Sequence, residues 1–128
     1  MSQSVDPQEP VGPDRFDAEE GLEDWRLLGD GANAFFRATS FAQSVRFVEA
    51  IEELLGDDDR PPDLDVRRDG VTVRIITSHA DFYGTTAGDV VAARRISRLA
   101  GDLGLVADPS ALQSLLLIPG APTTKGRR

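Results

Sequence analysis

Apolar and polar residues alternate in two short stretches of the chain that are joined by an Asp-Gly pair. Apolar side chains occupy every second position in residues 64–66 and again in residues 71–75. This period of two is typical of β-strands with one buried face. The Asp69-Gly70 pair favours a tight turn, because a type I′ turn requires positive φ at both of its central residues. The pattern predicts a β-hairpin whose second strand leads toward Ser78 and His79.

Two longer stretches repeat their apolar residues at steps of three and four instead. Ahead of the first, Ser40 and Gln43 form the pattern of a capping box, in which the amide reaches back to the cap. Ahead of the second, Thr86 is expected to cap the helix, with Asp89 near its positive end. Both stretches are therefore predicted to be amphipathic helices. The expected buried faces are Phe41, Val45, Val48, Ile51 and Leu55, widened by Phe47 and Leu54, and Ala92, Ile96, Leu99 and Leu103.

The two ends of the chain differ from its middle in composition. Residues 1–21 contain three prolines and many acidic side chains but few apolar ones, so we expect a disordered acidic tail. Residues 22–106 are expected to form the folded domain. Residues 107–128 are expected to be a C-terminal extension, in which Asp108-Pro109 begins a short helical turn. The apolar run at 115–118 is typical of a buried strand or of an edge strand that pairs with another subunit.

The predicted elements point to a two-layer fold. A further strand is expected at residues 34–38, ahead of the first helix. Two amphipathic helices must bury their apolar faces, and antiparallel strands offer one apolar face on which both can pack. The sequence therefore predicts an α+β two-layer sandwich with both main helices on one face of the sheet, plus a short C-terminal helix and strand.

Composition and charge narrow the range of partners. A chain of 128 residues is long enough for one compact domain. Its net charge of −8 disfavours nucleic acid and anionic membranes as partners, because both require a basic surface. No apolar run approaches the ~20 residues of a membrane helix. The first residues lack the pattern of a signal peptide, so we expect a cytoplasmic protein.

The sequence contains few of the usual metal ligands. It has one histidine and no cysteine, which disfavours a structural zinc site. The three adjacent aspartates at residues 57–59 offer carboxylates for a divalent cation, but no further ligands are evident and a solvated loop is favoured. We therefore expect neither a metal nor a cofactor.

The order of these elements, together with several short motifs, resembles the pterin-4a-carbinolamine dehydratase family. The residues that carry the resemblance are Trp25, Phe36–Phe41, Val45–Phe47, Pro62–Val66, Asp69–Val73 and the Gly84, Thr86 and Asp89 pattern. It covers the chain from Trp25 to about Gly104. The resemblance implies a four-stranded antiparallel sheet backed by helices, assembled as a homodimer or tetramer.

The chemistry implied by the resemblance is a lyase reaction, the dehydration of a 4a-hydroxytetrahydropterin to the quinonoid dihydropterin. Imidazole suits this reaction because its pKa lies near working pH. The family has two adjacent histidines where Arg60-Pro61 stand here, and arginine is a poor base because it stays protonated. Ungapped counting puts Ser78 at the position of the third histidine, with His79 one residue later. A step of one residue along a strand turns a side chain to the other face.

Two main hypotheses for function follow. In the first, the protein is a divergent dehydratase in which His79 is the acid and base, Asp89 orients it, and Arg60 and Asp63 contact the pterin. In the second, it is a catalytically degenerate binding or assembly module with another protein as partner, as the Arg60-Pro61 replacement suggests. An enzyme with a different substrate is a third reading. The expected catalytic residues are His79 and Asp89, and the expected substrate-binding residues are Arg60, Pro62, Asp63, Ser78, Phe82 and Tyr83.

Several of these residues also have ordinary structural roles. His79 would be a solvated loop histidine, and Asp89 would serve only the helix cap. Phe82 and Tyr83 offer faces on which a flat heterocycle can stack, but packing at the rim of the sheet is the more common role of such rings. The sequence leaves both interpretations open.

Overall fold

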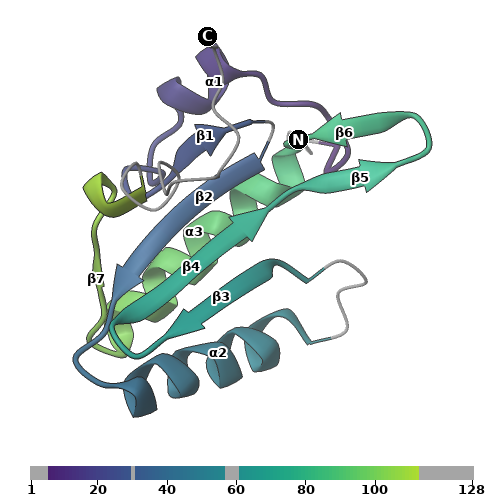
Figure 1. The fold of residues 1–128 in the computed structure, drawn as a ribbon. Helices are drawn as coiled ribbons and strands as arrows, with labels where there is room; N and C mark the ends of the chain where they lie inside the picture. Colours follow the sequence, from purple (N-terminus) through teal and green to yellow (C-terminus); the bar gives the residue numbers. More distant parts are fainter. Residues whose placement is uncertain (1–5, 30, 57–60, 113–128) are drawn as a thin grey trace, which may run out of the picture.

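The computed structural model describes residues 6–29, 31–56 and 61–112. Figure 1 shows how its helices and strands are arranged. In chain order they are α1 Pro13–Ala18, β1 Arg26–Leu28, β2 Gly31–Arg37, α2 Phe41–Leu55, β3 Asp63–Arg67, β4 Gly70–Ile75, β5 Thr77–His79, β6 Phe82–Gly84, α3 Ala87–Asp102 and β7 Val106–Ala107.

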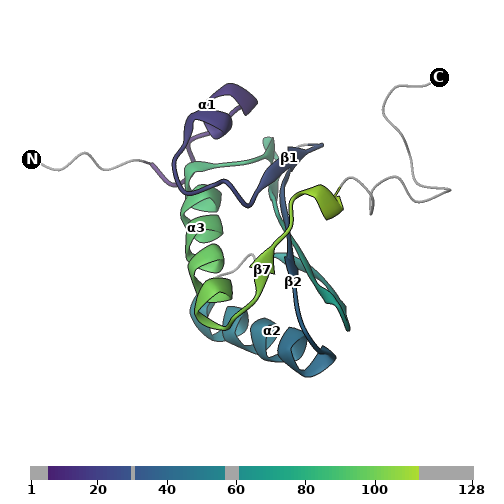
Figure 2. The same cartoon turned by 90° about the vertical axis from the view of Figure 1, so that its left-hand side faces the viewer.

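The main sheet is antiparallel, and its strands lie in the order β1-β2-β4-β3. Strand β7 pairs with the end of β2 that β1 leaves free. Helices α2 and α3 cover one face, as Figure 2 shows from the side. Strands β5 and β6 form a separate hairpin that extends beyond the end of the sheet (Figure 1). The predicted α+β two-layer sandwich is therefore confirmed.

Phe36 on β2 lies at the centre of the core. Its ring packs edge-on against the rings of Trp25 and Phe47, with centroid distances of 6.0 and 5.3 Å. Trp25 in turn donates a hydrogen bond from Nε1 to Ser97 Oγ on α3 at 2.8 Å. Edge-to-face aromatic pairs add to the stability that comes from burial. These contacts join β2, both helices and the segment before β1.

Both main helices are capped where the sequence predicts. Ser40 Oγ accepts a hydrogen bond from the Gln43 backbone N–H at 3.1 Å, and Thr86 Oγ1 accepts one from the Asp89 N–H at 3.3 Å. The Asp89 carboxylate returns to the Thr86 N–H at 3.0 Å, which completes a capping box. In α2 the return contact is displaced by one residue, because Gln43 Oε1 accepts from the Thr39 N–H.

The buried face of α2 is rotated toward Phe47, which was expected at the margin of the predicted stripe. Phe47 and Ile51 are buried together with Ser44, whereas Phe41 is 54% exposed. Both candidate stripes pass through Ile51, so the helical period alone does not distinguish them. The contact between Phe47 and Phe36 selects the observed face. In α3 the buried residues are Val90, Ala93, Ile96 and Ala100, flanked by the partly buried Ala92, Leu99 and Leu103.

The expectation of a disordered N-terminal tail is wrong for residues 6–21. Helix α1 forms within this stretch, and Val11 and Phe16 are only 5% and 3% exposed. The burial of these side chains in the common core offsets the entropy lost on ordering the segment. Average composition gave no sign of this, because only a few apolar residues make the contacts.

Other parts of the expected organisation are changed or lie beyond the described residues. Residues 82–84, for which the sequence predicts no strand, form β6 and pair with β5. Asp108 and Pro109 are followed by a helical turn at 110–112. The aspartates at 57–59 and the apolar run at 115–118 lie outside the described residues, so the predictions made for them stay untested.

The β3–β4 turn lies one residue earlier than predicted, with Arg68 and Asp69 between the two strands. Gly70 is required for a different reason, which is the close approach of β2. A Cβ atom at Gly70 would lie 2.5 Å from Phe35 Cζ and 2.6 Å from the Phe36 carbonyl oxygen. No side chain tolerates these distances without movement of the strand.

We predict that Gly70→Ala lowers the free energy of unfolding by about 2 kcal/mol or more, because the added methyl group overpacks the contact with β2. Urea unfolding measures the change. The matched control is Gly101→Ala in the last turn of α3, where a Cβ would meet nothing within 4 Å. That substitution is expected to be neutral or to stabilise by up to about 1 kcal/mol. Equal effects at the two glycines would contradict the argument.

Ser44 generates a second prediction. Its side chain is fully buried, and Oγ has no hydrogen-bond partner among the residues that the structure describes. We expect Ser44→Ala to raise the free energy of unfolding by about 1 kcal/mol, because a desolvated hydroxyl is removed. Ser40→Ala removes the cap of the same helix and should lower it by about 1 kcal/mol. Loss of stability in Ser44→Ala would show that the hydroxyl is satisfied.

Candidate functional site

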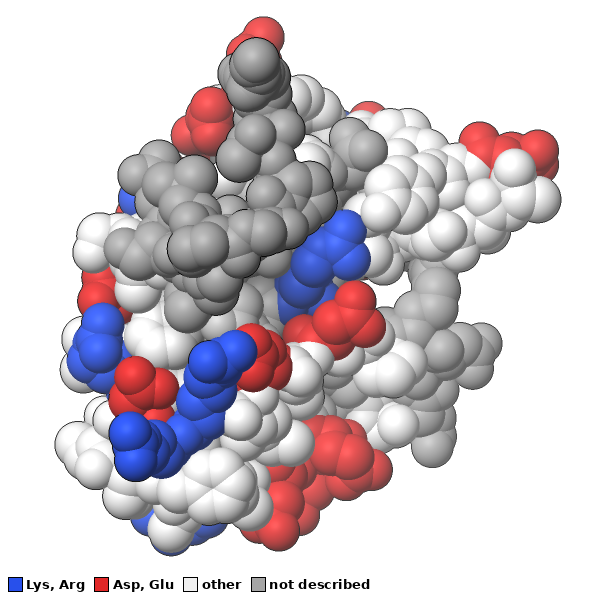
Figure 3. All heavy atoms as spheres, in the orientation of Figure 1, with Lys and Arg blue, Asp and Glu red and all other residues white. Residues whose placement is uncertain are grey.

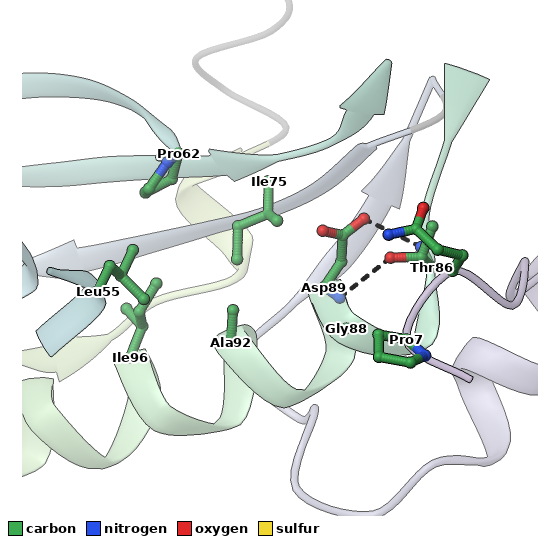
Figure 4. A pocket seen from close by; sticks show the side chains of 10 residues that line it. Pro7, Leu55, Pro62, Ile75, Thr86, Gly88, Asp89, Ala92 and Ile96 are labelled. Carbon is green, nitrogen blue, oxygen red and sulfur yellow. Dashed lines mark hydrogen bonds between the residues drawn. The ribbon is translucent and has the colours of Figure 1, made fainter. Parts of the chain in front are cut away.

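A pocket of about 180 Å³ lies where the ends of several elements meet (Figure 4). Its walls include Leu55 at the end of α2 and Ile75 at the end of β4, together with Ala92 and Ile96 from α3. The end of β4 therefore borders a hollow that residues of both helices line.

The Asp89 carboxylate reaches the same pocket from the first turn of α3 (Figure 4). Its Oδ2 accepts hydrogen bonds from Thr77 Oγ1 at 2.7 Å and from the Thr86 N–H at 3.0 Å. Thr77 is only 1% exposed and Asp89 is half-buried, so the contact is partly buried. Oδ1 makes no hydrogen bond with the residues that the structure describes. The carboxylate is thus fixed through one oxygen and can offer the other to a ligand.

The pocket brings together two of the predicted site residues. Pro62 lies at the entry to β3 and Asp89 at the start of α3, and both line the cavity. Arg60 lies outside the described residues, two positions before Pro62. The prediction that Arg60 contacts a ligand therefore stays untested.

His79 lies apart from these residues, on the β5–β6 hairpin. It is exposed and does not belong to the described lining of the pocket. Its Nδ1 accepts a long hydrogen bond of 3.4 Å from the Asp81 N–H. The ring lies against that of Phe82, its partner across the hairpin, at a centroid distance of 5.9 Å. His79 therefore contacts Phe82, whereas Asp89 is hydrogen-bonded to Thr77 and Thr86.

The remaining predicted residues lie around Arg74 on β4. Its guanidinium pairs with the Asp63 carboxylate at 3.5 Å and donates to the Tyr83 hydroxyl at 3.3 Å. Tyr83 is 57% exposed, and Ser78 is its partner across the hairpin. Figure 3 shows acidic and basic side chains intermixed over this face of the molecule. Asp63 and Tyr83 therefore share an exposed polar cluster.

The sequence did not identify most of the pocket. Ile96 was expected on a buried helical face, and a periodic pattern cannot distinguish a core side chain from a pocket wall. Thr77 is not among the site residues expected from the sequence, although it fixes the Asp89 carboxylate. The available signal was the cap pair itself, because a carboxylate near a helix start needs only one of its oxygens for the cap.

A second, wider hollow of about 500 Å³ lies beside the β3–β4 turn. Arg37, Arg68 and Asp108 are among its lining residues. The Ser110 hydroxyl and then the Arg37 guanidinium, which lies 2.5 Å from the carboxylate, lower the pKa of Asp108 below its ordinary value. Asp65, which hydrogen-bonds to Arg67, raises the pKa of that guanidinium. The Arg37–Asp108 pair holds the chain after β7 against the end of β2, whereas the Asp65–Arg67 pair lies within β3.

The described part of the chain contains neither a metal-binding cluster nor a membrane-spanning helix. Its residues include no group of three or more His, Cys, Asp or Glu side chains placed to hold a metal ion. None of its helices is long and apolar enough to cross a membrane.

The fold and the pocket define a two-layer α+β protein with a small cavity at one end of its sheet. A family model described as pterin 4 alpha carbinolamine dehydratase matches residues 11–99, and the chain therefore belongs to this family. The match includes β1 to β6, α1, α2 and most of α3.

Curated relatives agree with the family model. A protein of Mycobacterium leprae (strain Br4923) is 32% identical over 81 residues, which are 63% of this chain and 84% of the relative. A protein of Nocardia farcinica is 32% identical over 83 residues, or 65% and 85% of the two chains. One of Paracidovorax citrulli is 32% identical over 82 residues, or 61% and 69%. Each is named "Putative pterin-4-alpha-carbinolamine dehydratase".

The lowered pKa of Asp108 predicts a pH-dependent contribution to stability. The charged form is favoured in the folded state, so this contribution is present above the ordinary aspartate pKa of about 4 and is lost as pH falls below it. The difference in unfolding free energy between the natural chain and Asp108→Asn should therefore shrink in acid.

Urea unfolding between neutral and acidic pH measures this difference. Asp17→Asn is the control for removal of a negative charge, because Asp17 is exposed and has no ion pair or side-chain hydrogen bond in the described part of the chain. A difference for Asp108→Asn that stays constant across this range would refute the linkage.

Proposed function

We propose that this protein binds a reduced pterin in the Asp89 pocket and dehydrates 4a-hydroxytetrahydropterin there. Membership of the family supports the substrate class. The single observation that carries the proposal is the Asp89 carboxylate at the edge of a cavity with both apolar and polar walls. The carboxylate is fixed through Oδ2, and Oδ1 has no hydrogen-bond partner among the described residues. Apolar walls with a few fixed polar groups are what a flat heterocycle requires.

The proposed chemistry uses Asp89 as both base and acid. Oδ1 takes the proton from N5 of the pterin, and the N5 electron pair forms the new double bond to C4a. The C4a–oxygen bond breaks, and the departing hydroxyl receives a proton from the carboxylic acid and leaves as water. The carboxylate is restored, and the net change is the loss of one water molecule. The threonine contacts to Oδ2 would hold the reacting oxygen in position throughout.

This proposal assigns the role expected of His79 to Asp89. The reason is placement, because Asp89 lines the pocket whereas His79 is exposed on the projecting hairpin. General acid–base catalysis requires a group within hydrogen-bond reach of the proton that it moves. Asp63 and Tyr83 are occupied with Arg74 and are given no direct part in the reaction.

The test is turnover of 4a-hydroxytetrahydropterin by the purified chain, measured against the spontaneous reaction. Asp89→Asn should reduce the catalysed rate by about 100-fold or to the spontaneous rate, the typical loss when an acid–base group is removed. Asp102→Asn at the other end of α3 is the matched control, and thermal unfolding verifies the fold of both variants. Loss of turnover in His79→Ala with retention in Asp89→Asn would reverse the assignment.

A second candidate function is a binding or assembly module without turnover. It is favoured by the described lining of the pocket, which contains a carboxylate but no imidazole. Calorimetry together with the turnover assay separates the two functions. Pterin binding without dehydration faster than the spontaneous reaction would support the binding module. A stable protein partner would support the assembly role.

We also propose that the protein self-associates and is located in the cytoplasm. Strand β3 pairs with β4 on one side only within the described residues. A free strand edge is a ready site for pairing with a second chain. This geometry supports the homodimer or tetramer that the family resemblance implies.

A further inference from the structure

The N-terminal segment at residues 6–11 is fixed against the start of α3. Pro10 and Thr86 form an antiparallel bridge, and the Val11 N–H donates to the Thr85 carbonyl at 2.8 Å. The Ala87 N–H donates to the carbonyl of Glu9, two residues before Val11, at 2.9 Å. A helix start has four N–H groups without partners inside the helix, and this segment supplies one of the missing acceptors.

Pro7 supplies the next acceptor and also reaches the pocket. Its carbonyl accepts from the Gly88 N–H at 2.9 Å. Pro7 and Gln8 both line the Asp89 pocket, and Figure 4 shows Pro7 beside Gly88 and Thr86 at one side of it. Pro7 therefore binds the helix start and, together with Gln8, forms a wall of the cavity.

This wall is a feature that the family match does not cover. The matched region begins at residue 11, after Pro7 and Gln8. With the wall in place the pocket measures about 180 Å³. Cavities that hold drug-sized ligands are usually about 300 Å³ or larger. The pocket therefore has room for a compact ring system and little room for a substituent.

We propose that Pro7 and Gln8 form a specificity wall that limits the Asp89 pocket to pterins with little or no side chain on the ring. This inference rests on the proposed function and adds its substrate class. A pterin with a longer side chain would have to displace the segment and so lose its backbone hydrogen bonds to Ala87 and Gly88. A bare pterin ring would leave them intact.

The test compares the affinities of pterin and biopterin, which differ by a dihydroxypropyl side chain, through the quenching of their own fluorescence. In the full chain, biopterin should bind about tenfold more weakly than pterin, a difference of one decade in Kd. Deletion of residues 2–8 should bring the two Kd values to within about twofold of each other. Deletion of residues 2–5 keeps the wall and is the matched control, so it should preserve the tenfold ratio.

Gly88→Ala tests the same wall without a change in chain length. A Cβ at Gly88 would lie 3.2 Å from the Pro7 carbonyl oxygen and 3.4 Å from Pro7 Cβ, so it should push the segment outward. Alanine is favoured within a helix, so α3 should be retained. We expect a Kd ratio between those of the full chain and the 2–8 deletion. This variant decides the outcome if the deletion does not fold, which thermal unfolding shows.

The outcomes separate this inference from the proposed function. Pterin binding with the same Kd ratio in all chains would overturn the specificity wall and leave the proposed function standing. Binding of neither pterin by any chain would overturn both. Loss of pterin binding in Asp89→Asn, with the ratio restored toward one in the 2–8 deletion, is the result that both proposals require.

Discussion

The contact between Thr77 and Asp89 joins the two parts of the molecule that define the site. Thr77 begins the hairpin that continues from the sheet, and Asp89 lies in the first turn of α3. Their 2.7 Å hydrogen bond is partly buried, and the Thr86 N–H donates to the same carboxylate oxygen. A hydrogen bond to a charged group is stronger than one between neutral groups. The position of α3 relative to the end of the sheet therefore depends on this carboxylate, and so does the shape of the pocket beside it.

In the proposed function the Asp89 carboxylate has a structural role and a chemical role. The two roles are compatible because each uses a different oxygen. Oδ2 completes the cap and the contact with Thr77, while Oδ1 has no partner among the described residues. A group held at one atom loses little freedom when its other atom binds a ligand, which is the physical basis of preorganisation. The imidazole of His79 has no comparable support, because its Nδ1 has only a long contact with a neighbouring backbone N–H.

Local signals in the sequence predicted local structure well. The caps at Ser40 and Thr86 depend on residues three positions apart, and the structure contains both. The centre of the buried face of α2 could not be predicted in this way. Phe41 and Phe47 were both expected on the buried side, and the position of Phe36 across the core favours Phe47. Gly70 shows the same limit. It was selected for a turn, but the space it leaves is taken by β2, which is distant in sequence.

The site was harder to predict because it lies at the end of the sheet, between segments that are distant in sequence. Its walls are ordinary apolar residues from α2, β4 and α3, and only their arrangement makes them a cavity. The N-terminal segment completes that arrangement through backbone carbonyls, which leave no trace in side-chain composition. A segment with few apolar residues can therefore be ordered when its backbone meets the unpaired N–H groups of a helix start. The helix start needs acceptors whatever the sequence of the segment, so the segment is free to vary the side chains it presents to the pocket.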